Sequence, residues 1–174
     1  TRATEPGRPK KVAVLGVTNS WKLAPFNDPE WEIWGLNELY MFIPRWTRWF
    51  ELHRREIYEA DKNRVSDHVE KIKAMTTPVY MQQHWDDIPQ STPYPLDEVI
   101  RRFGAPARPY LTNSISYMIA LAMLEGFEEI GVYGVDMAHD CLAPEMRVLT
   151  ADLRWVRVGD LQVGQELLAF DEEV

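Results

Sequence analysis

Cys141 is the only cysteine in this chain of 174 residues, and it lies where two sequence patterns meet. Upstream of it, short apolar runs alternate with helix-like stretches. Downstream, short apolar runs are separated only by turn residues. A cysteine thiolate is a strong nucleophile, and a single cysteine cannot form an internal disulfide. The residue is therefore a reactive thiol or a buried one, and either fits a reducing compartment.

Polar residues follow most of the apolar runs upstream of Cys141. These short apolar runs, most of them followed by polar residues, predict strands over 11–17, 32–36, 46–52, 77–81 and 129–135. Helical patterns lie between these runs, and this alternation predicts a parallel α/β sheet over residues 11–138. The polar residues just past the strands, or at a helix start, are Thr18, Asn19, Ser20, Asn37, His53, Gln82, Gln83, His84, Thr112, Asn113, Ser114 and Asp136.

These residues would meet at one edge, because ligands of open α/β sheets bind beyond the carboxyl ends of the strands. A helix that begins near Ser114 would direct free N–H groups and its positive dipole end at a phosphate. Ser20 and Thr112 have helix capping as an alternative role, and His53 has a structural one. Asp136, directly after a buried strand, fits a ligand-holding carboxylate or a base. Neither the dinucleotide fingerprint nor the phosphate loop of NTPases occurs in the chain.

The helical segments show apolar positions at steps of three and four. Residues 54–75 fit one helix or two short ones, residues 97–103 a short helix, and a longer helix ends near Gly126. Pro89, Pro93 and Pro95 predict an irregular loop. The apolar positions expected to face the core are Ile57, Tyr58, Val65, Val69, Ile72 and Met75 in the first segment, and Ile115, Met118, Ile119, Ala122 and Met123 in the last.

Three stretches carry a resemblance that covers most of residues 11–138: KVAVLGVTNSWKL, WEIWGLNELY and TNSISYMIALAMLEGFEEIGVYGVDMA. Their order resembles bacterial sialyltransferases and the related motility-accessory, 6-hydroxymethylpterin diphosphokinase-like proteins. The first turn reads GVTNS where that pattern has Gly-Asn-Gly-Pro-Ser. The resemblance implies a Rossmann-like fold that binds a nucleotide or nucleotide-sugar, with glycosyl- or phosphoryl-transferase-like chemistry. A binding or interaction domain without catalysis is the alternative.

The same resemblance implies a role for each matching position. It places Gly16, Asn19 and Ser20 in the first nucleotide-binding turn and Asn37 on the base or ribose. It places Thr112 and Ser114 near the phosphates and Asp136 at the reacting end. We expect no metal site.

Residues 141–174, CLAPEMRVLTADLRWVRVGDLQVGQELLAFDEEV, resemble the N-terminal splicing block of inteins, the Hint module. Short strands are expected at MRVLT, RWVRV and QELLAF, as the first strands of an incomplete all-β module. The resemblance implies that the Cys141 thiol attacks the carbonyl of Asp140 without a cofactor. Later splicing steps would need C-terminal intein and host segments, supplied in cis or by a split partner. A core cysteine in a β-hairpin extension is the alternative.

Composition sets the remaining expectations. The formal charge of −8 argues against broad binding to nucleic acid or to an anionic membrane. No apolar run approaches a membrane span, so a cytoplasmic protein is expected. Arg45, Arg48, Arg54 and Arg55, with Trp46 and Trp49, are interpreted as a solvated rim over packed tryptophans. The expected division is a flexible arm over 1–10, a host domain over 11–140 and an intein fragment over 141–174.

Overall fold

The computed structural model describes residues 9–60, 67–103, 111, 113–135, 147–149, 154–157 and 160. The chain forms two compact units, Thr1–Val135 and Asp136–Val174, which are considered separately. The expected boundary between Asp140 and Cys141 lies outside the described residues, as do residues 1–8 of the expected arm. The domain boundary at Cys141 therefore stays a prediction.

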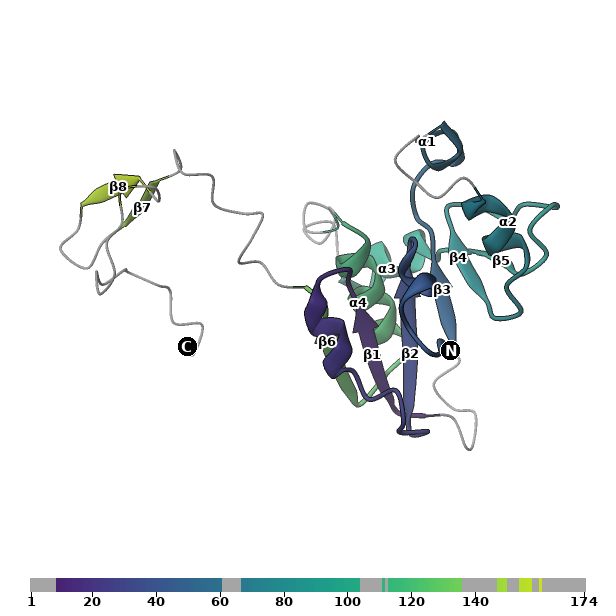
Figure 1. The fold of residues 1–174 in the computed structure, drawn as a ribbon, viewed down its shortest axis with the longest axis horizontal. Helices are drawn as coiled ribbons and strands as arrows, with labels where there is room; N and C mark the ends of the chain where they lie inside the picture. The colour runs from purple at the N-terminus through teal and green to yellow at the C-terminus, as the bar shows by residue number, and fades with distance from the viewer. Residues whose placement is uncertain are drawn as a thin grey trace. The chain divides into compact units, whose positions relative to one another are not determined.

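A six-stranded parallel sheet forms the centre of the first unit (Figure 1). Its order is β5-β4-β3-β2-β1-β6, so the chain builds outward from β1 on one side and returns to place β6 on the other. This confirms the predicted parallel α/β sheet. The strands are β1 (Lys11–Leu15), β2 (Trp31–Leu36), β3 (Arg48–Phe50), β4 (Val79–Met81), β5 (Ser91–Pro93) and β6 (Glu129–Tyr133).

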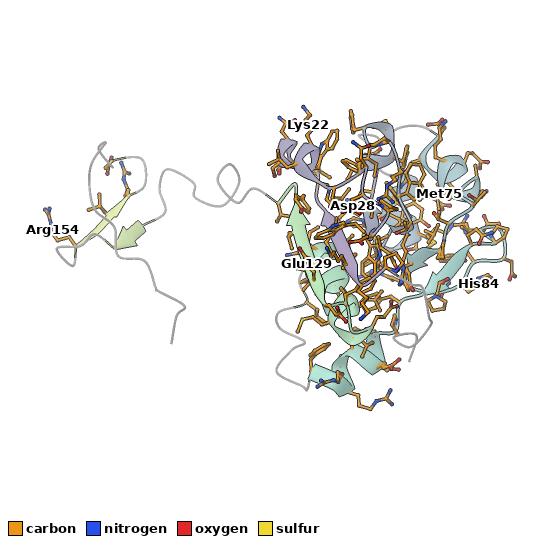
Figure 2. All side chains as sticks on the ribbon, turned by 90° about the horizontal axis from the view of Figure 1, so that it is seen from below. Lys22, Asp28, Met75, His84, Glu129 and Arg154 are labelled. Atoms are coloured by element: carbon orange, nitrogen blue, oxygen red, sulfur yellow. The ribbon has the colours of Figure 1, made fainter. Side chains whose placement is uncertain are left out.

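Alternating side chains give the sheet two apolar faces, because successive strand residues point to opposite sides. Ala13 and Leu15 belong to the core on one face, with residues of α2 (His68–Lys73) and of the loops around the 3-10 helices η2 (Asn19–Leu23) and η3 (Leu39–Met41). Val12 and Val14 belong to the core on the other face, with residues of α3 (Leu96–Phe103) and α4 (Ser114–Leu124). Figure 2 shows side chains packed on both sides of the sheet. Strand β2 is buried along its whole length, as expected for a central strand.

The described residues of the segment 54–75 include two short helices, α1 (Arg55–Ala60) and α2 (His68–Lys73). Tyr58, Ile72 and Met75 are buried, which confirms three of the expected core positions. Ile57 is 52% exposed, so its assignment to the core was wrong. Val65 lies outside the described residues.

Helices α3 (Leu96–Phe103) and α4 (Ser114–Leu124) cover the opposite face. Asn113 caps α4: its side chain accepts a hydrogen bond from the Ser116 N–H, in a capping box that Ser116 completes. Gly126, with φ 76°, follows the C-cap as predicted. Met118 and Ala122 are buried, but Met123 is 53% exposed, which corrects the predicted stripe. Because α4 is apolar almost all round, its pattern did not single out the buried face.

Strand β5 replaces part of the irregular loop that the prolines predicted. It pairs with β4 in parallel, with Met81 opposite Pro93. Proline lacks the N–H that a central strand would need, and it is tolerated here because β5 is at the edge of the sheet.

The second unit contains a two-stranded antiparallel sheet of β7 (Arg147–Leu149) and β8 (Trp155–Arg157). These strands fall within the first two of the three short strands expected after Cys141. The third expected strand lies outside the described residues. A hairpin of this size is too common to identify a Hint module, and that assignment stays a prediction.

Candidate functional site

Two glycines bring β1 and β6 together at the carboxyl edge of the sheet. The Gly16 N–H donates to the Tyr133 carbonyl at 2.7 Å, and the Thr18 N–H to the Gly134 carbonyl at 3.0 Å. A Cβ on Gly16 would lie 2.2 Å from the Gly134 oxygen, and one on Gly134, whose φ is +73°, would lie 2.4 Å from the Gly16 oxygen. Only glycine allows this approach. It sits where the strand order reverses, the usual ligand crevice of such sheets.

The turn after β1 holds Asn19 and Ser20, two of the polar residues predicted there, in different settings. Ser20 is half-buried, and its Oγ accepts a hydrogen bond from the Gly134 N–H at 2.9 Å. It therefore helps to join the turn to the end of β6, whatever else it binds. Asn19 begins η2 and is exposed.

Asn37, directly after β2, has the most unusual environment at this edge. Its φ is 50°, the only positive value among described non-glycine residues. Its Oδ1 is buried and has no hydrogen-bond partner in the described part of the chain. The backbone of Asn37 makes two hydrogen bonds: its N–H donates to the Phe50 carbonyl at 3.2 Å, and its carbonyl accepts from Trp49 Nε1 at 3.2 Å. A strained residue with an orphaned acceptor points to a ligand.

Helix α4 directs its N-terminus toward the same edge. It leads into β6 and so runs antiparallel to the strands, and the Tyr94 hydroxyl, just past β5, donates to the Tyr117 carbonyl in its first turn at 2.9 Å. Ser114 is its first residue and is half-buried. Four other predicted site residues, Thr112, Asp136, Asp140 and Cys141, lie outside the described residues. Their roles stay predictions.

A buried carboxylate follows β3 at this edge, and the sequence prediction missed it. Glu51 is fully buried and accepts from two imidazoles: His53 Nδ1 at 2.5 Å and His68 Nε2 at 2.9 Å. The His53 N–H also lies 3.3 Å from the same carboxyl oxygen. His68 is buried too, and its Nδ1 lies 3.0 Å from the Tyr40 hydroxyl. We call Glu51, His53, His68 and Tyr40 the Glu51 cluster.

Tyr58 of α1 packs edge-on against His68 at 6.0 Å between ring centroids. Its hydroxyl is buried and has no hydrogen-bond partner in the residues that the structure describes. Burial raises the pKa of Tyr58 to about 12. Tyr58, beside the Glu51 cluster, thus carries a second buried polar atom, after the Asn37 amide oxygen, for which the described residues offer no hydrogen-bond partner.

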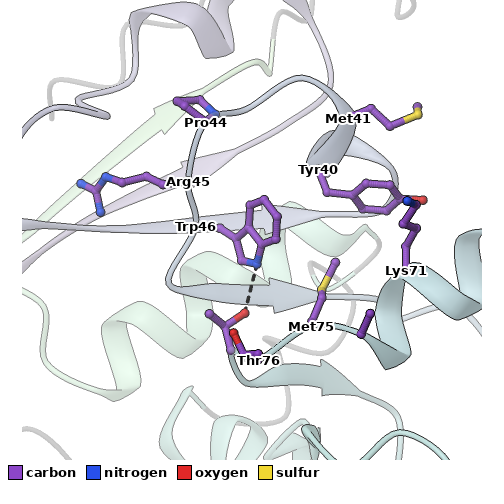
Figure 3. A pocket seen from close by; sticks show the side chains of 10 residues that line it. Tyr40, Met41, Pro44, Arg45, Trp46, Lys71, Met75 and Thr76 are labelled. Atoms are coloured by element: carbon purple, nitrogen blue, oxygen red, sulfur yellow. Dashed lines mark hydrogen bonds between the residues drawn. The ribbon is translucent and has the colours of Figure 1, made fainter.

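A pocket of about 580 Å³ opens on the face of the sheet that η3 and α2 cover, and none of the predicted site residues lines it. Tyr40, Trp46 and Met75 form much of its wall, and Trp46 donates to the Thr77 hydroxyl at 3.0 Å (Figure 3). Arg45, at its rim, donates to main-chain carbonyls that include those of Phe26 and Asp28. Tyr40 is shared by this pocket and the Glu51 cluster.

The arginine-rich segment differs from the solvated rim expected for it. Arg48 is buried, with ion pairs to Glu32 and Glu125, both at 2.9 Å. Arg55 binds Asp87 at 2.7 Å. In the described ranges, no three His, Cys, Asp or Glu side chains are arranged so that they could hold a metal ion. None of the helices that the structure describes has the length and apolar character of a membrane span.

The chain matches no protein-family model and no curated protein sequence. Among solved structures it is similar to the sialyltransferase CstII from Campylobacter jejuni, in complex with the substrate analogue CMP-3FNeuAc. The TM-score is 0.50 at 14% sequence identity, and the match covers 75% of this chain. It spans 60% of the length of that sialyltransferase. The likeness shows the fold, which is Rossmann-like as the sequence predicted.

Proposed function

We propose that the first unit binds a nucleotide or nucleotide-sugar at the carboxyl edge of its sheet, as a transferase-like domain. The observation that carries the proposal is the Asn37 amide oxygen: it is buried and has no hydrogen-bond partner among the described residues, which is costly unless a ligand binds it. The left-handed backbone of Asn37 is a conformation that is common at functional sites. The Asn37 amide would bind the base or ribose, as the sequence resemblance implies.

Two features of the edge and one comparison support this choice of ligand. The Gly16 turn brings the backbones of β1 and β6 close together where the strand order reverses. The N-terminus of α4, at Ser114, offers a positive dipole end to a phosphate. A structure with the same fold holds a CMP-sugar analogue. Asn19, Ser20, Thr112 and Asp136 are proposed to complete the site.

Calorimetric titration of CMP into the chain tests the proposal. Asn37→Gly is the informative variant, because glycine accepts the positive φ and removes only the amide. We expect Asn37→Gly to weaken CMP binding about tenfold, the loss of one hydrogen bond to a buried group, and to leave the unfolding temperature unchanged or higher.

Asn27→Gly is the matched control, since Asn27 is exposed in a turn away from this edge. It should bind CMP as the unsubstituted chain does. No CMP binding by the unsubstituted chain, or equal binding by Asn37→Gly, would contradict the proposal.

We also propose a second activity, at Cys141, as the first residue of an intein. The spacing Cys-x₅-RVLTAD-x₂-WV-x₂-GDL supports it, and strands β7 and β8 lie on the RVL and WVR segments of that motif. The Cys141 sulfur would attack the Asp140 carbonyl carbon. The peptide C–N bond would break as the thioester forms, and the freed amine would take the thiol proton.

Incubation with dithiothreitol tests this first step, because an external thiol cleaves a thioester and so separates residues 1–140 from 141–174. Mass spectrometry should show both products slowly accumulating from the unsubstituted chain and neither from Cys141→Ala. An intact mass for both proteins would rule the step out.

A further inference from the structure

We propose that the pocket between η3 and α2 binds a small aromatic anion, at a site separate from the nucleotide site at the carboxyl edge. The pocket is lined by residues of η3, of the loop before β3, and of the segment that runs from α2 to the loop before β4. Its volume of about 580 Å³ is in the range of small-molecule sites. None of the residues proposed to bind the nucleotide lines it, so the two sites are independent proposals.

The Trp46 ring is a fixed stacking surface in this pocket. Its Nε1–H donates to the Thr77 hydroxyl at 3.0 Å, and its ring packs edge-on against Trp49 at 5.1 Å between centroids. These contacts hold the ring although it is only partly buried. The Met75 side chain, drawn beside Trp46 in Figure 3, lines the same pocket. A flat aromatic ligand can pack against both the indole face and the methionine sulfur.

Tyr40 provides a second rigid wall. Its ring stacks on His68 at 5.8 Å and packs against Trp49 at 5.6 Å between centroids. Its hydroxyl lies 3.0 Å from His68 Nδ1, within hydrogen-bond distance. Tyr40 therefore offers the pocket its ring and not a polar group. Because contacts within the protein hold both aromatic walls, a ligand can bind between them without first ordering them.

The charged residues of the pocket favour an anion. Among the described residues that line it, Lys71 and Arg45 are cationic and none is acidic, in a chain whose formal charge is −8. Lys71 Nζ lies 3.6 Å from an oxygen of Asp67, and both side chains are at least half exposed. An ion pair of this kind is weak, so the carboxylate of a ligand can compete for Lys71 at little cost.

Arg45 contributes charge without a direct contact to the ligand. Its guanidinium donates to the main-chain carbonyls of Phe26 and Asp28. Lys71 is thus the cation that would bind the anionic group, while the aromatic ring of the ligand lies against Trp46.

Indole-3-acetate is the probe, because it joins an aromatic ring to a carboxylate. A ¹H–¹⁵N NMR titration of the full chain measures its affinity and its location together. We expect a Kd of about 1 mM or tighter, as for a ligand of this size. Indole, which lacks the carboxylate, should bind about threefold more weakly. Cyclohexylacetate, which lacks the aromatic ring, should bind about fivefold more weakly.

Lys71→Gln and Lys73→Gln are a matched pair, because both lysines belong to α2 and, of the two, Lys71 lines the pocket. Lys71→Gln should weaken indole-3-acetate binding about threefold and leave indole binding unchanged. Lys73→Gln should change neither. Equal effects of the two substitutions on indole-3-acetate would contradict the proposed place of the carboxylate.

Thr76→Trp tests the pocket itself. Thr76 is an exposed residue of the lining, so a larger side chain there can fill the pocket without entering the core. Both indole compounds should bind more than about tenfold more weakly to this variant, which loses most of the apolar contact. Unfolding in urea checks that the variant is folded. Binding as tight as that of the unsubstituted chain would overturn the proposal.

The location of the shifts separates this site from the nucleotide site. Indole-3-acetate should shift the Trp46 Nε1–H resonance and leave Gly16 and Asn37 unchanged, and saturating CMP should not displace it. Displacement by CMP, shifts centred on Gly16 and Asn37, or no shift of Trp46 at about 10 mM probe would each overturn the proposal. A chain that binds the probe as expected but binds no CMP loses the nucleotide site alone.

Discussion

Strand β3 carries a buried charged cluster at each end, and the two are built differently. At its amino end, the Arg48 guanidinium bonds Glu32 of β2 and Glu125 at the end of α4, with no side chain of the three more than 10% exposed. At its carboxyl end, Glu51 bonds two histidines, and one of them, His53, is 38% exposed. The first cluster joins elements of the fold, whereas the second leads from the core to the carboxyl edge of the sheet, where we propose that a ligand binds.

A buried charge by itself therefore does not identify a functional site. Burial alone would lower the pKa of Arg48, but the hydrogen bond to Glu125 and the charge of Glu32 raise it above its ordinary value. The guanidinium therefore stays charged, stacked 4.7 Å over the Trp34 ring. Location at the carboxyl edge and an exposed titratable ring are what distinguish the Glu51 cluster.

Arg48→Ala should have the largest effect on stability. It leaves two buried carboxylates without their cation, which costs about 3–5 kcal/mol. Unfolding in urea, monitored by tryptophan fluorescence, measures the loss in the free energy of unfolding. Arg48→Lys keeps the positive charge but lacks the planar guanidinium group, so it should lose less free energy of unfolding than Arg48→Ala. A loss below about 1 kcal/mol for Arg48→Ala would show that the cluster does not hold β2, β3 and α4 together.

Glu51→Gln should destabilise the chain less, by about 1–3 kcal/mol. The amide keeps one acceptor oxygen, but its NH₂ group faces a ring nitrogen that donates in the native cluster. The same urea titration applies. If Glu51→Gln lost as much free energy of unfolding as Arg48→Ala, the proposed contrast between a structural Arg48 cluster and a functional Glu51 cluster would be wrong.

Tyr58→Phe should have the smallest effect, near zero at pH 7, because it removes an unsatisfied hydroxyl. The pKa of Tyr58 is raised from 10.0 to about 12 by burial, so the folded state holds this proton more tightly than the unfolded chain. The contribution of this proton to the free energy of unfolding is complete below pH 10 and is lost as the pH rises toward 12. Alkaline unfolding should therefore begin at higher pH in Tyr58→Phe. An unchanged alkaline midpoint would contradict this.

Tyr94→Phe is the control for the hydroxyl deletion. The Tyr94 hydroxyl donates to the Tyr117 carbonyl at 2.9 Å. Its removal should cost about 1 kcal/mol at pH 7, unlike the loss of the Tyr58 hydroxyl.

Most strands and their parallel direction could be predicted from the sequence, because strands buried on both faces leave continuous apolar runs, as in β1 and β2. The order of the strands in the sheet was not predicted. Strand β5 could not be predicted, because Pro93 looks like a loop residue unless the edge position is known. The edge residue Asn37 was predicted from its place after a strand. The Glu51 cluster was not, since its members come from positions 40, 51, 53 and 68 and meet only through packing.

We propose that the ligand binds at the carboxyl edge of the sheet and not at the cluster of Arg48, Glu32 and Glu125. The most direct measurement is a ¹H–¹⁵N NMR titration of the chain with CMP. Shifts should concentrate at Gly16, Asn37 and His53 and be absent from Arg48 and Glu125. Shifts confined to the Arg48 end of β3, or no shifts at saturating CMP, would contradict the claim.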